Sequence, residues 1–432
     1  MGFVSTVVSQ QPNVHHRDRR VTTIGGLMVA LGLFIAVAFG LVVPSWAHSQ
    51  LTFNPINSAV HAPWHLGALT LETRWSDTLL GVFAMVLGVE VILRQPRRAL
   101  SRFGGVSILF LLALLLWSSR TSGPASVNFV DLTAVLVGSS SLAMVLIYGA
   151  LSGVMCERAG VVNIAIEGQF IAGAFLGSMI ESTTNNFWLA TVAGALAGAL
   201  LGWILAFLAL RYMSDQIIVG VVIVTLLSSL SSYLNLQVLT PYPQYNLGNL
   251  APNLAIPLLY KIPILGPVLF NQTGFFYLAI ILIALISFGL FRTRWGLRVR
   301  AVGEHPKAAE SVGINVIGTR YRNVILGGAI AGIGGVAFMA TQGQFQPGYT
   351  SGFGYIALAA LIFGRWTPSG AVVASVLFGI SSYLANNLQS YSIPVSTEIL
   401  GMFPYLITIA VVAGLIGRVR PPAADGIPYQ RS

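Results

Sequence analysis

The sequence has few charged residues and a single cysteine. Charged side chains make up 8% of the 432 residues, whereas hydrophobic residues make up 55%. Soluble globular domains carry about 25% charged residues, so a soluble fold is excluded. The one cysteine, Cys156, excludes an internal disulfide and a metal site built on several cysteines.

Motifs for catalysis and nucleotide hydrolysis are also missing. The sequence has no GxxxxGK[ST] phosphate-binding loop, no acidic cluster for magnesium, no HExxH motif and no cysteine–histidine cluster. An intramembrane enzyme would need a nucleophile beside a base, and no such pair is evident. We therefore expect a chain that is not an enzyme, binds no metal or cofactor, and does not hydrolyse ATP itself.

Long apolar runs dominate what remains. Several reach the roughly 18 residues that a membrane span requires, and they lack the alternation of a transmembrane β-barrel. The fold class is therefore an all-α polytopic membrane protein with about twelve transmembrane helices. We expect the short run at 353–364 to cross as well, because Arg365 would otherwise face outwards. The expected spans are 21–43, 77–93, 103–117, 130–154, 161–180, 188–210, 216–237, 274–291, 324–340, 353–364, 371–388 and 399–417.

The basic residues indicate the orientation of these spans. The net charge is +10, but Arg and Lys gather in short loops between apolar runs, which is the positive-inside pattern rather than a nucleic-acid-binding face. We expect Arg94–Arg102, Arg292–Arg322 and Arg418–Arg420 to be cytoplasmic, with both termini on that side. Glu90 is placed to pair with Arg94 four residues later.

The polar segment Thr121–Asn128 divides the chain. Residues 1–125 are expected to form a cytoplasmic tail and an added block of three membrane helices, for which the sequence suggests no function. Residues 126–418 are expected to form the core, with a cytoplasmic loop near 292–322, and residues 419–432 a cytoplasmic tail. Gly194, Gly198 and Gly202 recur every four residues, which favours close helix packing over a sliding surface.

The segment 157–177 places acids and amides where the chain turns back into lipid. A charged side chain in hydrocarbon costs at least ~3 kcal/mol. Asn163 and Glu167 are four residues apart, so on a helix they would share a face and could hydrogen-bond, with Gln169 nearby. They could hold helices together, or they could lie beside a translocation path or its gate.

The stretch ERAGVVNIAIEGQ, residues 157–169, resembles the signature of permease subunits of bacterial ABC importers. The resemblance is to the branch for nucleosides, ribose-type sugars and branched-chain amino acids, and within it to the nucleoside members linked to basic membrane proteins. SGFGYIALAALIFGRWTPSGA and the tail RVRPPAADGIPY resemble one of the two nucleoside-permease subunits. The resemblance runs from near Asp131 to the C-terminus.

The resemblance implies an ATP-driven importer of the bacterial inner membrane. It implies a separate cytoplasmic ATPase that binds ATP and magnesium, a second permease subunit forming a heterodimer, and an extracytoplasmic substrate-binding lipoprotein. The expected substrate is a nucleoside or related ribose-containing solute, and a sugar or branched-chain amino acid is the alternative. An ion-coupled secondary transporter is disfavoured, because no deep acid pairs evidently with a base, although Glu90, Glu167 and Glu181 keep it open.

The helix expected at 216–237 carries many hydroxyls. Such hydroxyls usually bond their own backbone carbonyls, yet they would also suit a wet pore lining, and both interpretations stay open. Ser228, Ser232 and Asn235 are therefore candidate path residues.

A short helix is expected near 304–313, because Pro306 suits its first turn and Gly313 its end. The stretch resembles the coupling loop of the same permeases, which implies docking on the ATPase; a helix lying on anionic lipid is the alternative. Small side chains would then be buried in a cleft of the ATPase, so Ala309→Trp should uncouple it. The candidate coupling residues are Glu304, Pro306, Ala308, Ala309, Glu310 and Gly313.

Overall fold

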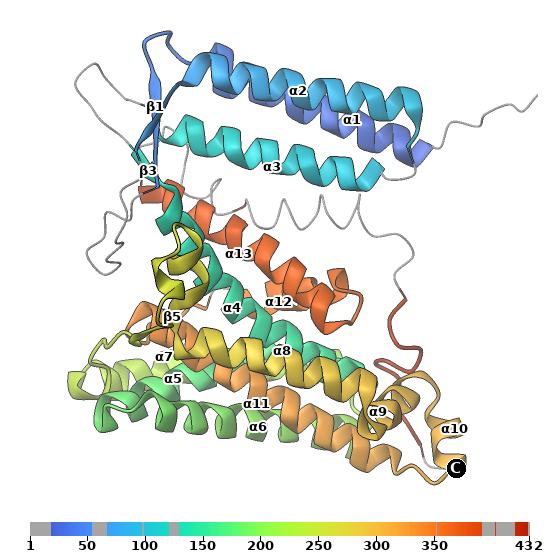
Figure 1. Ribbon diagram of the computed structural model, residues 1–432. Helices are drawn as coiled ribbons and strands as arrows, with labels where there is room; N and C mark the ends of the chain where they lie inside the picture. The colour runs from blue at the N-terminus through green and yellow to red at the C-terminus, as the bar shows by residue number, and fades with distance from the viewer. Residues whose placement is uncertain are drawn as a thin grey trace, which may run out of the picture. The chain divides into compact units, whose positions relative to one another are not determined.

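The computed structural model describes residues 19–53, 67–96, 99–120, 129–350, 352–390, 402 and 420–430 (Figure 1). The contacts divide the chain into two units. Unit 1 consists of Met1–Thr52 and Ala68–Val130, and unit 2 consists of Phe53–Gly67 and Asp131–Ser432.

Among its described residues, unit 1 contains three α-helices, one π-helix and a small sheet. Strands β1 and β2 are antiparallel, and the order in the sheet is β2-β1-β3. The π-helix η1 continues α1 directly. The elements are α1 (Arg19–Phe34), η1 (Ile35–Leu41), β1 (His48–Thr52), β2 (Leu69–Glu72), α2 (Thr73–Arg94), α3 (Ala99–Ser118) and β3 (Phe129–Asp131).

Glycines let α1 and α2 approach closely. A Cβ on Gly32 would lie 2.7 Å from the Gly81 carbonyl oxygen, and a Cβ on Gly81 would lie 2.6 Å from that of Gly32. Small residues permit such backbone contact between membrane helices. The predicted Glu90–Arg94 pair is confirmed at 3.1 Å, and Arg102 joins it at 2.9 Å.

Unit 2 contains ten helices with irregular connections among its described residues. The longer helices are α4 (Leu132–Glu157), α5 (Ile166–Thr184), α6 (Phe187–Arg211), α7 (Gln216–Leu234), α8 (Gly274–Arg292), α11 (Val316–Gln342) and α13 (Pro368–Ser390). The shorter ones are α9 (Arg294–Glu304), α10 (Pro306–Ser311) and α12 (Phe353–Phe363). The segment between α7 and α8 is ordered, as η2 (Asn235–Leu239), η3 (Pro243–Tyr245), β4 (Asn253–Ala255), η4 (Leu259–Lys261), η5 (Gly266–Phe270) and β5 (Asn271–Thr273).

Helix α11 is the centre of unit 2, and it packs on α6, α5 and α4. A Cβ on Gly198 would lie 2.1 Å from the Gly328 carbonyl oxygen, and one on Gly332 would lie 2.0 Å from that of Gly194. The glycines of α6 and α11 are therefore packing surfaces, as their spacing predicted. On another face of α11, a Cβ on Gly335 would lie 2.1 Å from the Phe170 carbonyl oxygen of α5.

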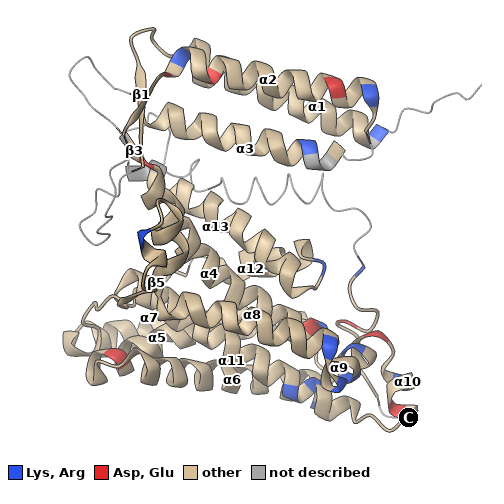
Figure 2. Cartoon of the chain, viewed as in Figure 1, with Lys and Arg blue, Asp and Glu red and all other residues tan. Residues whose placement is uncertain are grey.

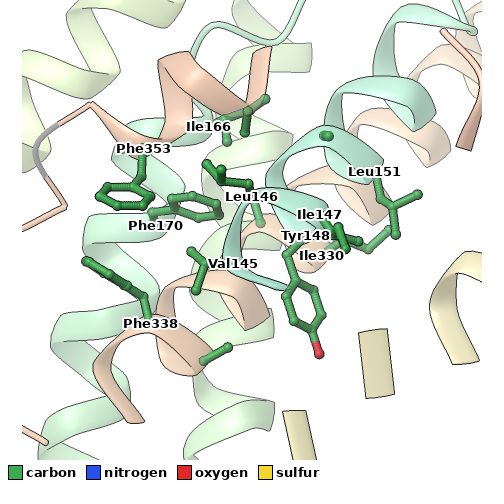
Figure 3. Close-up of a cluster of buried hydrophobic side chains, with 14 of the residues drawn as sticks. Val145, Leu146, Ile147, Tyr148, Leu151, Ile166, Phe170, Ile330, Phe338 and Phe353 are labelled. Carbon is green, nitrogen blue, oxygen red and sulfur yellow. The ribbon is translucent and has the colours of Figure 1, made fainter. Parts of the chain in front are cut away.

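A buried apolar cluster fills the space between α4, α5, α11 and α12 (Figure 3). Figure 3 shows Phe170, Phe338 and Phe353 arriving from three different helices. Tyr148 of α4 is fully buried, and its hydroxyl donates to the Phe275 carbonyl at 2.7 Å, so its polar atom is satisfied.

The helices agree with a polytopic membrane protein. Eight helices in the described part of the chain are long and apolar enough to cross a membrane. The runs at 102–118 and 353–363 form shorter apolar helices. Helix α5 is long enough but carries Glu167, Gln169 and Glu181, and it is not among the eight. Apart from Met402, the last expected span, 399–417, lies outside the described residues, as do residues 1–18 and the polar segment 121–128.

Candidate functional site

The segment between α4 and α5 does not have the conformation that its spacing suggested. We predicted that Asn163 and Glu167 share one helix face and hydrogen-bond to each other, and this is wrong. Asn163 precedes α5, in non-helical backbone, and its amide donates to Ser152 at 3.2 Å and to Gln169 at 3.1 Å. The amides of Asn163 and Gln169 therefore pair with each other, while Glu167 points elsewhere.

Glu167 binds the beginning of α12. Its two carboxylate oxygens accept hydrogen bonds from the backbone N–H groups of Gly352, at 3.1 Å, and Gly354, at 2.6 Å. Those N–H groups have no partner within α12, and the positive end of the helix dipole lies there. A Cβ on Gly354 would lie 2.5 Å from the Glu167 backbone nitrogen, so only glycine permits this approach. Glu167 therefore caps α12 from outside that helix.

The same segment also holds the other end of α12. The indole N–H of Trp366 donates to the Glu157 carboxylate, and the Arg158 guanidinium donates to the Trp366 carbonyl at 2.7 Å and the Arg365 carbonyl at 3.3 Å. Arg365 and Trp366 both have φ of 53°, which is uncommon for residues other than glycine. Residues 157–167 thus hold both ends of α12.

A cavity of about 310 Å³ opens beside the beginning of α12. Its walls come from α4, α11, α12, α13 and the non-helical segment 343–350. They combine aromatic rings with primary amides. The lining residues are Leu142, Phe338, Gln342, Gln344, Gln346, Tyr349, Phe353 and Asn386.

Asn246 ties the segment between α7 and α8 to this cavity. Its side-chain oxygen accepts from the Phe345 N–H at 2.8 Å, and its amide donates to the Phe345 carbonyl at 2.9 Å. Phe345 lies between two cavity residues, Gln344 and Gln346. Two hydrogen bonds therefore join the 235–273 segment to the cavity wall. The sequence showed Asn246 merely as one polar residue in a proline-rich loop.

The hydroxyls of α7 bond mainly to their own helix. Ser231 and Ser232 donate to the Ser228 carbonyl, at 3.0 and 2.8 Å, and Thr225 donates to the Val221 carbonyl at 3.0 Å. This favours the interpretation that the hydroxyls of α7 bond their own backbone carbonyls rather than line a pore. None of Ser228, Ser232 and Asn235 lines the cavity of about 310 Å³, so their role as path residues stays a prediction.

Two short helices form the basic end of unit 2, where Lys and Arg gather around α9 and α10 (Figure 2). Helix α10 begins at Pro306, and Gly313 has a φ of 82°, so the predicted boundaries of the short helix are close to those observed. Helix α9 was missed, because its arginines were interpreted as a loop following the membrane span. Thr293 caps α9 by accepting from the Gly296 N–H at 3.2 Å.

The predicted docking geometry of Ala309 is wrong. Its side chain is already buried within this chain, 3% exposed, against Val302, Val316 and Tyr429. Ala308 is exposed, and so is Val312, at 74%. A partner protein can therefore contact Ala308 and Val312, whereas Ala309 packs the helix onto its own chain.

The segment 420–430 lies against this end of unit 2. Arg320, a fully buried residue of α11, donates to the Ile427 carbonyl at 3.0 Å and the Ala424 carbonyl at 3.3 Å. The Ala424 N–H donates to the Gly303 carbonyl at 2.8 Å, and the Tyr429 hydroxyl donates to Glu310. The segment thus joins α9, α10 and α11.

The 420–430 segment also reaches the segment that holds α12. A Cβ on Gly160, whose φ is 84°, would lie 2.8 Å from the Arg320 guanidinium and 3.0 Å from the Ala424 carbonyl oxygen. Burial raises the pKa of the Asp425 carboxyl from 3.8 to about 7, although a hydrogen bond with Glu157 and the charge of Arg320 act in the opposite direction. Glu304 accepts from the Ala423 N–H at 3.2 Å.

In the part of the chain that the structure describes, Glu157, Glu167 and Glu181 do not hydrogen-bond to one another. Glu157 binds Trp366 and lies beside Asp425, Glu167 binds backbone N–H groups, and Glu181 accepts from Asn249 at 3.0 Å. Each acid has its own local partner. Within the described residues, no three His, Cys, Asp or Glu side chains are grouped so that they could hold a metal ion.

Comparison with known proteins identifies relatives of unit 2. The family described as branched-chain amino acid transport system / permease component matches residues 135–412. The chain is 37% identical over 318 residues to the nucleoside ABC transporter permease protein NupC of Lactococcus lactis, covering 71% of this chain and 99% of that protein.

Two further relatives are named for guanosine and for glucose. The guanosine ABC transporter permease protein NupQ of Bacillus subtilis is 36% identical, over 70% of this chain and 98% of the relative. A putative glucose ABC transporter permease protein of Haloferax volcanii, TsgC13, is 32% identical, over 63% and 88%. No solved structure matches the chain.

Proposed function

Because the chain belongs to the family of ABC-transporter permease components, in which a separate subunit carries the ATPase, we propose that it is one half of the membrane pore of a nucleoside importer. The observation that carries the proposal is the match to almost the whole length of a nucleoside permease. The multi-pass fold and the short helices at the basic end are those that such a subunit needs.

We propose about twelve membrane crossings with both termini in the cytoplasm, in the bacterial inner membrane. The gathering of basic residues around α9 and α10 supports this orientation. A test replaces Cys156 with Ala and Val312 with Cys, and labels spheroplasts with an impermeant thiol reagent. We expect labelling only after permeabilisation, whereas Leu258→Cys, 80% exposed in the 235–273 segment, should react at once. Immediate labelling of Val312→Cys would overturn the topology.

The proposed partners follow from the two ends of unit 2. The ATPase docks on the exposed face of α10, at Ala308 and Val312. A substrate-binding lipoprotein docks on the ordered 235–273 segment, which Asn246 links to the cavity wall. A second permease subunit completes the pore as a heterodimer.

The proposed mechanism transmits movement through α12. Docking at α9–α10 displaces Gly303 and the 420–430 segment, which contact Arg158 and Gly160. Residues 157–167 hold α12 at both ends, so α12 moves with them. Phe353, at the start of α12, lines the cavity, and the cavity wall therefore follows the ATPase.

The coupling experiment compares Ala308→Trp with Ala309→Trp in membranes containing all subunits. Ala308→Trp should leave permease abundance normal, abolish nucleoside uptake, and prevent the ATPase from co-purifying. Ala309→Trp overpacks the chain's own core, costing about 1–3 kcal/mol, and should lower abundance instead. Normal uptake and normal ATPase recovery with Ala308→Trp would contradict docking and would favour the alternative that α10 lies on lipid.

A further inference from the structure

The cavity of about 310 Å³ beside the beginning of α12 has room for a small molecule. Its volume is at the lower end of the roughly 300–1,000 Å³ of small-molecule sites. None of its eight lining residues is charged. A phosphate or a zwitterionic amino acid would find no partner for its charges there, and burying an unpaired charge is strongly unfavourable.

One wall of the cavity is aromatic. The rings of Phe338 and Tyr349 are stacked, with centroids 4.8 Å apart, and Phe338 lies 5.0 Å from Phe353. Figure 3 shows Phe338 and Phe353 on the same side of the apolar cluster. Aromatic rings prefer offset-stacked or edge-to-face contact with other flat rings.

The remaining lining supplies uncharged hydrogen-bonding groups. Gln342, Gln344, Gln346 and Asn386 each carry an amide that can donate and accept. The Tyr349 hydroxyl is buried and has no hydrogen-bond partner in the part of the chain that the structure describes. Buried hydroxyls normally have a partner, so a bound solute would satisfy this one.

We infer that this cavity is the binding site of the transported solute within the membrane, and that it selects an uncharged molecule with a flat ring and a polar edge. A nucleoside fits this description, whereas a nucleotide and a free amino acid do not. The inference rests on the proposed function and adds the residues that distinguish the solute. The aromatic wall stacks on the flat ring, and the amides and the Tyr349 hydroxyl form hydrogen bonds with the polar edge of the ring and with the hydroxyls of the solute.

The first experiment measures protection of the cavity in purified permease complex without ATP. With Cys156 replaced by Ala, Gln342→Cys and Gln346→Cys report on the cavity, and Leu258→Cys serves as the exposed control. Saturating uridine should slow thiol labelling at both cavity positions several-fold. Uridine monophosphate and valine should not, and labelling at the control should be unchanged. Equal rates with and without uridine, or equal protection by uridine monophosphate, would overturn the inference.

The second experiment measures uridine uptake at saturating binding protein. Tyr349→Phe removes one hydrogen bond and should lower turnover about 2- to 10-fold. Tyr355→Phe, which alters an exposed tyrosine of α12 outside the cavity, should not. Equal uptake by Tyr349→Phe and wild type would remove Tyr349 from the site.

The two outcomes separate the cavity from the proposed function. Uridine uptake by the wild type without protection of the cavity would keep the importer and reject the cavity. Protection of the cavity without uptake would keep the cavity and reject the nucleoside importer.

Discussion

The two ends of unit 2 are fastened by different chemistry. At the end formed by residues 235–273, the neutral amide of Asn246 bonds both backbone groups of Phe345. At the α9–α10 end, the charged Arg320 bonds two carbonyls of the 420–430 segment, and the carboxyls of Glu157 and Asp425 lie beside each other. The Asn246 contact has no titratable group, so its strength does not change with pH. The contact at the α9–α10 end includes the Asp425 carboxyl, so its strength does change with pH.

Because the two ends are held by different interactions, breaking them should cost different amounts of free energy. Removing a neutral partner leaves ordinary polar groups unsatisfied, whereas removing one member of a buried charged group leaves the others without compensation. We expect the α9–α10 end to be the more fragile under mutation and the 235–273 end to be the more tolerant.

The largest effect is expected from Arg320→Met. Breaking a buried charged group by removing one partner costs about 3–5 kcal/mol. The 420–430 segment should detach, which limited proteolysis of the membrane-embedded complex would detect, and uptake should be lost. Arg322→Met, an exposed arginine of the same helix, is the matched control and should behave as wild type. A protease-resistant 420–430 segment in Arg320→Met would break the comparison.

A smaller effect is expected from Asn246→Leu. The Phe345 N–H and carbonyl lose their partners, at a cost of about 1–3 kcal/mol each if they remain buried. Uptake stimulated by the binding protein should fall, while the ATPase still co-purifies. Asn253→Leu alters an exposed asparagine in the same segment and should leave uptake unchanged. If Asn246→Leu impairs transport more than Arg320→Met does, the expectation that the α9–α10 end is the more fragile one is wrong.

Glu167→Gln tests whether the negative charge that caps α12 is needed for transport. The amide can accept from one of the two N–H groups of α12 but not from both, which should cost about 1.5–3 kcal/mol. We expect normal insertion and reduced uptake in a reconstituted assay. Unchanged uptake in Glu167→Ala would instead assign Glu167 to helix packing alone.

The smallest effect is a pH dependence of the 420–430 segment. The pKa of Asp425 is raised to about 7, so the folded segment holds a proton that the detached one releases. Attachment is therefore strongest below about pH 4 and weakens as the pH rises towards 7, above which it levels off. A spin label at Ile427→Cys, in the Cys156→Ala background, should become more mobile over that range.

The Asp425→Asn variant is the control for this pH dependence. The variant removes the titration of Asp425, so the mobility of the label at position 427 should rise less between pH 5 and pH 8 than in the parent. A label whose mobility rises as much in Asp425→Asn as in the parent would place the titration on another group.

The sequence predicted local features well. Long apolar runs predicted the eight described helices that are long and apolar enough to cross a membrane, and the four-residue spacing of Gly194, Gly198 and Gly202 predicted a packing surface. Pro306 and Gly313 marked the short helix α10. In each case the physical cause lies within a few residues, so it is legible in the sequence.

Contacts between distant residues could not be predicted in this way. The Asn163–Glu167 pair failed because a spacing of four residues implies a shared face only on a helix, and Asn163 precedes one. Glu167 instead binds backbone 185 and 187 residues later. Ala309 looked available for a partner because nothing near it in the sequence indicates that Tyr429 covers it.

The contact between Glu310 and Tyr429 joins residues 119 positions apart. At 5–20 residues per second, the ribosome needs about 6–24 s to make the intervening chain. In the proposed topology, α9 and α10 reach the cytosol during that time, before residues 420–430, which contact them, have been made. If the ATPase docks on α10 as proposed, the complete docking surface forms only when almost the whole of unit 2 has been translated, and assembly with the ATPase then follows synthesis of the pore helices.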